Sequence, residues 1–428
     1  MTKNFMLSMN RNRKNKIWKM KMNILLKQIV VFLPLVLGAG SVLAQEIKDT
    51  AISNKNTLSD LDYFFRDILS IQKYVGLGAC LVKNEKVIWE GYYRYSNLEE
   101  KDQLRRENIF PLMSISKTIT TFALLQLYEK GLFALDDDVN NYISIKVRNP
   151  NFPEIPITFR MLLTHTASFE DVLSTGLKIP QNVPRPQSSH GDSEMTLEEY
   201  ILEILSPNGK FYSTEYFSQN KPGMKYSYSN IAFSLLGYLV EKIAKKDFSE
   251  YCKEEIFVPL KMKNTSWHLR GLDTGKVIFG YSFSPDDSIP NYRKVKHFGE
   301  PGYPAGMLRT DMDDYVKFIN VILNNGSYKD RQLLKPETVT AMLTPQNVEN
   351  IPSRAFKITD ISLCWLISEV ENEDLYNMNG FSGSLFINTY FSRKDKSAII
   401  YYFSGINMKN MIAVTEITKK LYHALESF

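Results

Sequence analysis

A serine and a lysine three residues apart, in Ser114-Ile-Ser-Lys117, could carry out nucleophilic catalysis together. This spacing puts a hydroxyl and an amine on one face of a helical turn. Burial disfavours the charged form of a lysine, so a buried amine can act as a base and turn the hydroxyl into a nucleophile. Ser70–Lys73 and Ser218–Lys221 have the same spacing, but only Ser114 begins an apolar helical pattern. Ser114 is therefore the candidate nucleophile and Lys117 its candidate base.

A tyrosine and an asparagine two residues apart, Tyr228 and Asn230, form the second candidate group. They stand at the corner between a polar loop and an apolar helical pattern. At such a corner the phenol can point toward a leaving group and the amide toward a substrate carbonyl. The same letters in Tyr95-Ser-Asn97 indicate a polar turn after a strand, because no apolar helix follows them.

The hydrophobic pattern predicts the elements that position these groups. Apolar residues recur at helical spacing in six segments, 58–70, 114–131, 158–164, 197–205, 230–245 and 412–425. Four β-rich runs are expected to form two hairpins, 76–82 with 87–93 and 384–390 with 397–403. Strands at both chain ends predict an α+β fold with one antiparallel sheet built from both ends, flanked by helices, and an all-helical region inserted in the middle.

The stretch 168–222 is rich in Ser, Pro and Asn and carries one short helical pattern. Polar, loop-like segments of this length usually cover a binding site rather than fill a core. We expect a variable insertion or lid near the cleft.

Residues 1–44 predict a secretory signal peptide. A basic stretch without any acid precedes the apolar run Ile29–Leu37, and Val42-Leu-Ala44 matches a cleavage site. Cleavage after Ala44 would leave residues 45–428 as the mature domain. The alternative is an uncleaved anchor, in which case the protein would contact a membrane. Export without a disulfide framework indicates a periplasmic or secreted bacterial protein.

Composition and charge exclude several classes of function. The 428 residues are 44% hydrophobic and 23% charged, which excludes a disordered chain. Eight of the 52 basic residues lie in 1–44, so 44 basic residues face 47 acidic ones in the remainder, and no nucleic-acid partner is expected. Three distant cysteines form neither a disulfide framework nor a zinc motif. We expect no metal and no cofactor, since no ligand spacing or nucleotide-binding loop occurs.

Five segments in this order together resemble the serine β-lactamase-like and penicillin-binding-protein superfamily, in its branch of class C β-lactamases, D,D-peptidases and esterases. They are Phe110–Thr118, Gly131–Asp138, Ile157–Thr166, Pro222–Asn230 and Gly306–Asp313. The resemblance runs from about residue 58 to residue 425. It implies the β-lactamase/D,D-peptidase fold and an acyl-serine mechanism.

The resemblance also implies roles for single residues. Ser114 would be the nucleophile, Lys117 its base and Tyr228 the proton shuttle to the leaving group, while Asn230 orients the substrate. The backbone N–H of Ser114 would supply half of an oxyanion hole. His165, within Leu-Leu-Thr-His-Thr, is expected to make a structural hydrogen bond rather than to take part in catalysis.

The third motif of this family, a Lys-Thr-Gly or His-x-Gly on a strand facing the serine, departs from the pattern here. Met378 occupies the basic position in Met378-Asn379-Gly380-Phe381-Ser-Gly. Gly380 would let a substrate backbone approach, and the Phe381 N–H would be the other oxyanion donor. A thioether cannot donate a hydrogen bond, so recognition of a substrate carboxylate is in doubt. We expect Met378, Asn379, Gly380 and Phe381 to contact substrate.

The sequence therefore leads to one main hypothesis and two alternatives. The main one is an exported serine hydrolase that forms an acyl-enzyme at Ser114 on a β-lactam, a D-amino-acid peptide or a small ester. Its partner would be a small-molecule or peptide substrate, including one derived from peptidoglycan. The first alternative is a carboxylesterase without lactamase or peptidase activity. The second, motivated by Met378, is a catalytically impaired cell-wall-binding or regulatory homologue.

Overall fold

An antiparallel sheet built from both ends of the chain organises the structure, a computed structural model that describes residues 58–170, 189–284, 286, 289–353, 355–407 and 409–427. The predicted signal segment 1–44 lies outside the described residues. The sheet has eight strands, in the order β12 (Lys357–Ile361), β13 (Leu366–Val370), β14 (Glu373–Phe381), β15 (Leu385–Ser392), β16 (Ser397–Ser404), β1 (Gly76–Lys83), β2 (Lys86–Asn97) and β3 (Asp102–Gln103).

The central strands are apolar on both faces because both faces are covered. In β1, Leu77, Ala79 and Leu81 face one side, while Cys80 and Val82 face the other. All five are buried, as expected for alternating side chains in a strand between two layers. β1 pairs with β16 along its whole length, from Gly76↔Ser404 to Lys83↔Ser397. This pairing joins the two chain ends and confirms the predicted sheet.

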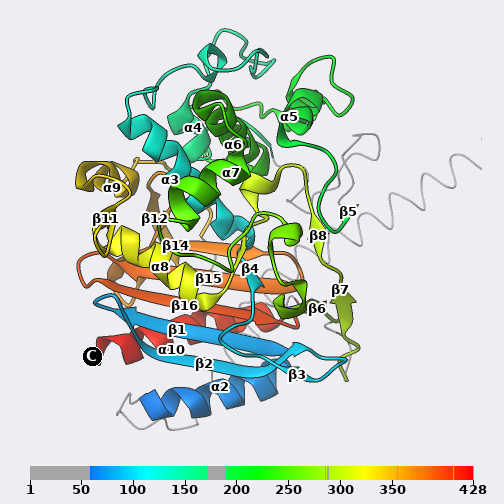
Figure 1. The fold of residues 1–428 in the computed structure, drawn as a ribbon, viewed down its shortest axis with the longest axis vertical. Helices are drawn as coiled ribbons and strands as arrows, with labels where there is room; N and C mark the ends of the chain where they lie inside the picture. The colour runs from blue at the N-terminus through cyan, green and yellow to red at the C-terminus, as the bar shows by residue number, and fades with distance from the viewer. Residues whose placement is uncertain are drawn as a thin grey trace, which may run out of the picture. The chain divides into compact units, whose positions relative to one another are not determined.

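Two terminal helices cover one face of the sheet. They are α2 (Leu58–Gln72) and α10 (Ala413–Glu426), on the same side of the sheet in Figure 1. Their apolar faces bury Phe65 of α2 and Leu421 of α10 against Tyr401 and Phe403 of β16. Both helices match segments predicted from helical spacing.

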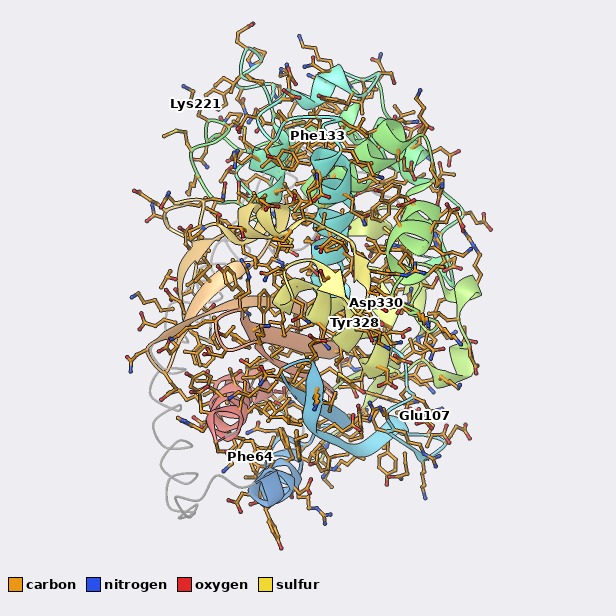
Figure 2. The ribbon with its side chains drawn as sticks, turned by 60° about the vertical axis from the view of Figure 1, so that its left-hand side comes forward. Phe64, Glu107, Phe133, Lys221, Tyr328 and Asp330 are labelled. Atoms are coloured by element: carbon orange, nitrogen blue, oxygen red, sulfur yellow. The ribbon has the colours of Figure 1, made fainter. Side chains whose placement is uncertain are left out.

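The other face carries the main helical layer and the larger core. Figure 2 shows Phe133 in this layer and Phe64 of α2 toward the opposite end, with the sheet between them. The helices of this layer and its surroundings are α3 (Ser116–Glu129), α4 (Phe159–Leu163), α5 (Leu197–Leu205), α6 (Asn230–Ala244), α7 (Phe248–Cys252), α8 (Met312–Leu323) and α9 (Pro336–Leu343). The predicted α+β class is confirmed.

The middle region is predominantly helical rather than all-helical. Four short ribbons brace it: β4 (Phe110–Pro111) with β9 (Arg309–Thr310), β5 (Ser189–His190) with β8 (Phe298–Gly299), β6 (Gly280–Ser282) with β7 (Arg293–Val295), and β10 (Ser327–Tyr328) with β11 (Arg331–Gln332). Ribbons of two or three residues leave too short an alternation to be recognised in the sequence. The first strand of the β4–β9 ribbon, β4, lies just before the segment that carries Ser114.

Part of the stretch 168–222 belongs to the core, which corrects the expectation that the stretch lies outside it. Helix α5 begins at a capping box of Thr196 and Glu199 and buries Tyr200, Ile201 and Ile204 in the main apolar cluster. An amphipathic helix contributes such a face to a core whatever the polarity of its flanking loops. Residues 171–188 of this stretch lie outside the described residues.

The three cysteines are buried as free thiols. Within the described ranges, no helix is long and apolar enough to span a bilayer.

Candidate active site

Ser114 lies on a tight turn rather than in the first turn of the long helix, where the sequence pattern had put it. It is the middle residue of the 3-10 turn η1 (Met113–Ile115), and α3 begins two residues later. Met113 has a φ of +47°. A residue with a Cβ adopts this left-handed conformation at a cost of about 1–2 kcal/mol. The Leu112 N–H donates to Leu308 O (2.8 Å), which anchors the turn to the ribbon region.

Lys117 is completely buried in the first turn of α3, with an exposed fraction of 0%. Its Nζ donates to Ser114 Oγ (3.2 Å), to Asn230 Oδ1 (2.6 Å) and to the carbonyl oxygen of Ala305 (2.6 Å). A neutral amine could keep its two short bonds to Asn230 and Ala305 and accept the serine proton at its lone pair. The predicted serine–lysine pair is therefore assembled with a geometry suited to proton transfer.

Tyr228 completes the group from more than a hundred residues further along the chain. Its hydroxyl oxygen lies 2.6 Å from Ser114 Oγ and 3.5 Å from Asn230 Oδ1. Helix α6 begins directly after it, where the Ser229 hydroxyl accepts a hydrogen bond from the Ala232 N–H (3.2 Å) as the N-cap. The cap fixes the direction of the loop, so Tyr228 and Asn230 both point toward Ser114 and Lys117.

His165 holds the Tyr228 loop through its backbone and its side chain. Its carbonyl accepts from the Ser227 N–H (2.8 Å), and its Nδ1 accepts from the Ser229 N–H (3.1 Å). Its ring packs on that of Tyr228 with centroids 4.6 Å apart. Burial holds the pKa of His165 well below its usual value, so the imidazole is neutral at pH 7. The structure thus contains the predicted structural hydrogen bond.

The four residues of the third motif lie on β14, close to the catalytic turn. The β13–β14 pairing begins at Leu366↔Asn377, so residues 378–381 extend beyond β13 along the cavity. Met378, Asn379 and Phe381 line the cavity together with Ser114. Met378 is buried, and Phe381 is 45% exposed at the rim.

Gly380 makes a close contact that the sequence did not predict. A Cβ at this position would lie 2.4 Å from the Leu112 carbonyl oxygen and 2.7 Å from Met113 Cβ. The protein's own turn η1 therefore approaches this glycine closely, while the approach of a substrate backbone stays a prediction. Without a side chain, β14 can pack directly against η1.

Replacement of Gly380 by alanine is expected to destabilise the fold by about 1–3 kcal/mol, because an extra methyl group in a packed contact forces a backbone shift. The same shift would displace Ser114 and lower activity. Urea denaturation measures the first effect. Gly275→Ala is the matched control, since a Cβ there would meet only Asp273 Oδ1, at 3.3 Å on an exposed turn. Equal midpoints for the two variants would contradict this account.

A cavity of about 320 Å³ opens beside Ser114. One wall is polar and contains Tyr226, Ser227 and Asn230. The rest of the lining includes an apolar wall, whose members come from β12, β13 and the segments before them: Pro352, Ile358, Ile361, Cys364 and Leu366. As far as the structure describes the chain, no Asp, Glu, Lys or Arg lines this cavity.

Sequence reasoning missed this apolar wall and the Ala305 carbonyl. The run Lys357-Ile-Thr-Asp-Ile361 shows an alternation that could have predicted a strand, although it is only five residues long. A backbone carbonyl that accepts from Lys117 leaves no signal in the sequence, because every residue has one.

The other serine–lysine and tyrosine–asparagine pairs do not assemble a site. Ser70 is exposed on α2, and the buried Ser218 hydroxyl bonds to Asn220 instead (2.7 Å). Asn97 lies on β2 and accepts from Lys294 (3.0 Å). None of the described residues of 168–222 lines the cavity beside Ser114. In the part of the chain that the structure describes, no group of three His, Cys, Asp or Glu side chains could hold a metal ion.

Comparison with known proteins places this site in a family. The family model described as "Beta-lactamase" matches residues 61–409. Penicillin-binding protein 4* of Bacillus subtilis (strain 168) is 25% identical over 200 residues, which are 46% of this chain and 40% of that protein. The chain spans less than half the length of the curated relatives it matches.

Solved structures share the fold at low identity. The D-amino acid amidase from Ochrobactrum anthropi SV3, complexed with L-phenylalanine amide, superposes with a TM-score of 0.68 and 18% identity, over 86% of this chain and 99% of that one. EstCE1, described as a hydrolase with promiscuous acyltransferase activity, superposes with a TM-score of 0.66 and 17% identity, over 84% and 96%. Since the family model covers most of the chain and Ser114, Lys117, Tyr228 and Asn230 lie together inside it, the protein belongs to the beta-lactamase family, a family of serine hydrolases.

Proposed function

We propose that this protein hydrolyses an amide or an ester through an acyl-enzyme at Ser114. The observation that carries the proposal is the position of one atom. Ser114 Oγ lies within hydrogen-bond distance of both the Tyr228 hydroxyl (2.6 Å) and Lys117 Nζ (3.2 Å). A nucleophile in contact with a base and with a second proton carrier has what acyl transfer requires.

The proton follows the hydrogen bonds of this group. Neutral Lys117 takes the proton of Ser114 as Oγ attacks the substrate carbonyl. Tyr228 then donates its phenolic proton to the leaving amine or alcohol. Lys117 passes the proton that it took from Ser114 to the Tyr228 oxygen, which makes the phenol neutral again. The leaving group departs, an ester is left on Ser114, and a water molecule hydrolyses it by the same steps in reverse. The Asn230 amide, fixed by its bond to Lys117 (2.6 Å), orients the substrate.

The backbone N–H groups of Ser114 and Phe381 are the proposed oxyanion donors. The close packing of β14 on η1 at Gly380 supports this assignment, because it holds the two backbones near each other. Each such donor is worth roughly 2.7–4 kcal/mol in the transition state.

The lining of the cavity supports a neutral substrate within this class. The apolar wall offers burial for an uncharged group, and no cation of the lining is available to a carboxylate. Met378 contributes a thioether where the family has a basic residue, and a thioether cannot donate a hydrogen bond. We therefore favour small esters, and amides without a free carboxylate at the leaving side, over β-lactams and D-Ala-D-Ala peptides. The amidase that shares the fold fits this preference.

Parallel assays with p-nitrophenyl butyrate, a D-amino-acid amide, a D-amino-acid peptide and nitrocefin test the proposal. Turnover of the first two, with covalent labelling by a fluorophosphonate, is the expected result. Faster turnover of nitrocefin or the carboxylate-bearing peptide would contradict the preference for neutral substrates. Turnover of the ester alone would identify a carboxylesterase.

A second candidate function, a cell-wall-binding or regulatory protein with impaired turnover, is favoured by Met378 alone. Replacing Met378 with histidine is expected to raise kcat/KM for carboxylate-bearing substrates about 10-fold or more, because a hydrogen bond to a charged group contributes roughly 1.5–3 kcal/mol. Met378→Leu, which keeps the buried position apolar, is the control. If turnover of any substrate appears only in Met378→His, the natural protein is better described as a binder.

We also propose that the protein acts outside the cytoplasm, on a small molecule or on a peptide that can come from peptidoglycan. The basic and apolar pattern of residues 1–44 supports export. N-terminal sequencing of the secreted or periplasmic fraction would test for cleavage after Ala44.

A further inference from the structure

The carbonyl oxygen of Ala305 is one of two short acceptors that hold Lys117 Nζ, and Asn230 Oδ1 is the other. It lies in the 3-10 turn η7 (Tyr303–Ala305), which belongs to neither of the helices that carry Lys117 and Asn230. A lysine has a flexible four-carbon stem, so the position of its amine depends on where such acceptors stand. The groups that fix this turn therefore decide whether the Lys117 lone pair reaches Ser114.

Thr120 ties the turn to α3. It is completely buried, one helical turn after Lys117. Its hydroxyl donates to the carbonyl oxygen of Pro304 at 2.8 Å, whereas the Ser116 carbonyl of its own helix is 3.4 Å away. A hydroxyl has only one proton, so the shorter contact is the hydrogen bond that it makes. The Pro304 carbonyl belongs to the peptide unit that leads into Ala305, so this bond orients the backbone beside the acceptor of Lys117.

Ser116 ties the other end of the same segment to α3. Its side chain is also completely buried, and its Oγ accepts a hydrogen bond from the Leu308 N–H (3.1 Å). Ser116 and Thr120 stand four residues apart in α3, on one face of the helix. These two side chains, the hydroxyl clamp, hold the segment 304–308 at both ends, and Ala305 lies between them.

Helix α6 packs directly against this segment. A Cβ at Gly237 of α6 would lie 2.3 Å from Pro304 Cγ. Pro304 fits there only because α6 has a glycine at the contact, although glycine is unfavourable inside a helix. The turn η7 contacts both α3 and α6, which lie side by side in Figure 1. Packing and the hydroxyl clamp together fix the position of the Ala305 carbonyl.

We propose that Thr120 is a positioning residue for the general base, with Ser116 as the second member of the hydroxyl clamp. The inference rests on the proposed function, in which Lys117 takes the Ser114 proton. Neither Thr120 nor Ser116 is among the described residues that line the cavity beside Ser114. They act through the Ala305 carbonyl, which holds Lys117 Nζ at 3.2 Å from Ser114 Oγ. Loss of the clamp should therefore slow the chemical step and leave substrate binding unchanged.

Thr120→Val tests the proposal, because valine has the shape of threonine without its hydroxyl. We expect kcat for p-nitrophenyl butyrate to fall about 10–100-fold and KM to change less than about 2-fold, since a misplacement of about 1 Å can cost about 100-fold in rate. The burst phase gives the acylation rate, which should fall with kcat. Thr120→Ser keeps the donor and should restore kcat to within about 3-fold of the natural value.

Thr418→Val is the matched control. Thr418 is also completely buried on a helix, α10, where it bonds to the Val414 carbonyl of its own helix (2.9 Å) and to one distant partner, the Tyr401 hydroxyl (2.8 Å). Its loss of stability, measured by urea denaturation, should resemble that of Thr120→Val, but its kcat and KM should be natural. An equal fall of kcat in the two variants would assign the effect to lost stability and overturn the positioning role.

A double variant separates positioning from a separate effect of Thr120 on the site. In Lys117→Met the Ala305 carbonyl has no amine to hold, so adding Thr120→Val should slow the residual fluorophosphonate labelling of Ser114 by less than about 2-fold. In the natural background the same substitution should slow labelling about 10-fold or more. Equal losses in both backgrounds would overturn the proposal, because Thr120 would then act without Lys117.

The position of the Lys117 amine can also be followed without a substrate. In ¹³C NMR of the lysine ε-carbons, the Lys117 signal is assigned by its loss in Lys117→Met. It should shift in Thr120→Val and stay in place in Thr418→Val, and an unchanged signal in Thr120→Val would overturn the positioning role. Ser116→Ala should shift it as well, and carries the test if Thr120→Val fails to fold. If the natural protein forms no acyl-enzyme at Ser114, the proposed function fails, while this signal still decides whether the clamp positions Lys117.

Discussion

Replacing Ser114 with alanine is expected to lower kcat by a factor on the order of 10⁴–10⁶, because the substituted chain has no atom to form the acyl bond. Covalent labelling by a fluorophosphonate or penicillin probe should disappear. The fold should be retained, since Ser114 sits on a turn that is held mainly by backbone hydrogen bonds of its neighbours. Active-site titration combined with intact-protein mass spectrometry measures the loss of activity and the loss of covalent labelling.

Ser70→Ala is the matched control for this variant. Ser70 belongs to a serine–lysine pair of the same spacing but is exposed on α2, outside the cavity. It should keep full turnover and labelling. Substantial turnover in Ser114→Ala would refute the acyl-serine mechanism, whatever the outcome for Ser70.

Replacing Lys117 with methionine is expected to lower kcat by a factor on the order of 10²–10⁴, the usual contribution of a positioned general base. Methionine fills the volume of the buried side chain but can neither accept the Ser114 proton nor donate to Asn230 and Ala305. The rate of acylation, measured as the burst phase, should fall together with the rate of probe labelling.

The Lys117 variant needs a test of stability alongside its kinetics. Two buried acceptors lose their donor, which costs about 1–3 kcal/mol each. Tyr228→Phe removes only the phenolic hydroxyl and is the second variant, with a fall in kcat expected in the same range and a smaller loss of stability. Lys221→Met, at the exposed lysine of another serine–lysine pair, is the control. Unchanged burst rates in both Lys117→Met and Tyr228→Phe would contradict their assigned roles.

The sequence predicted the catalytic group because its residues carry local signals. Ser114 and Lys117 stand at the start of a strongly apolar helix, and Tyr228 and Asn230 at the start of another. Residues at the start of a buried helix are held at the end of a rigid element, so their positions follow from the pattern of the helix itself. A local signal also predicted β1 and β16, which are continuous runs of β-rich residues that become buried on both faces.

Other features of the structure were predicted wrongly from the sequence, or not at all, because they depend on long-range packing. No local signal predicted that the missing Cβ of Gly380 makes room for the Leu112 carbonyl from a segment 268 positions earlier. The stretch around α5 was expected to lie outside the core, but the apolar face of α5 lies in it. Loop-like composition describes the flanks of such a helix and says nothing about its inner face.

The sequence by itself determined the α+β class, the family resemblance and the four polar side chains of the catalytic group, since helical and strand periodicity and short-range spacing are properties of neighbouring residues. Only the tertiary structure decided that Ser114 Oγ meets the Tyr228 hydroxyl at 2.6 Å and that apolar side chains from a distant part of the chain line the cavity beside it. Distances and cavities arise where segments far apart in the chain pack together, and no local pattern specifies them.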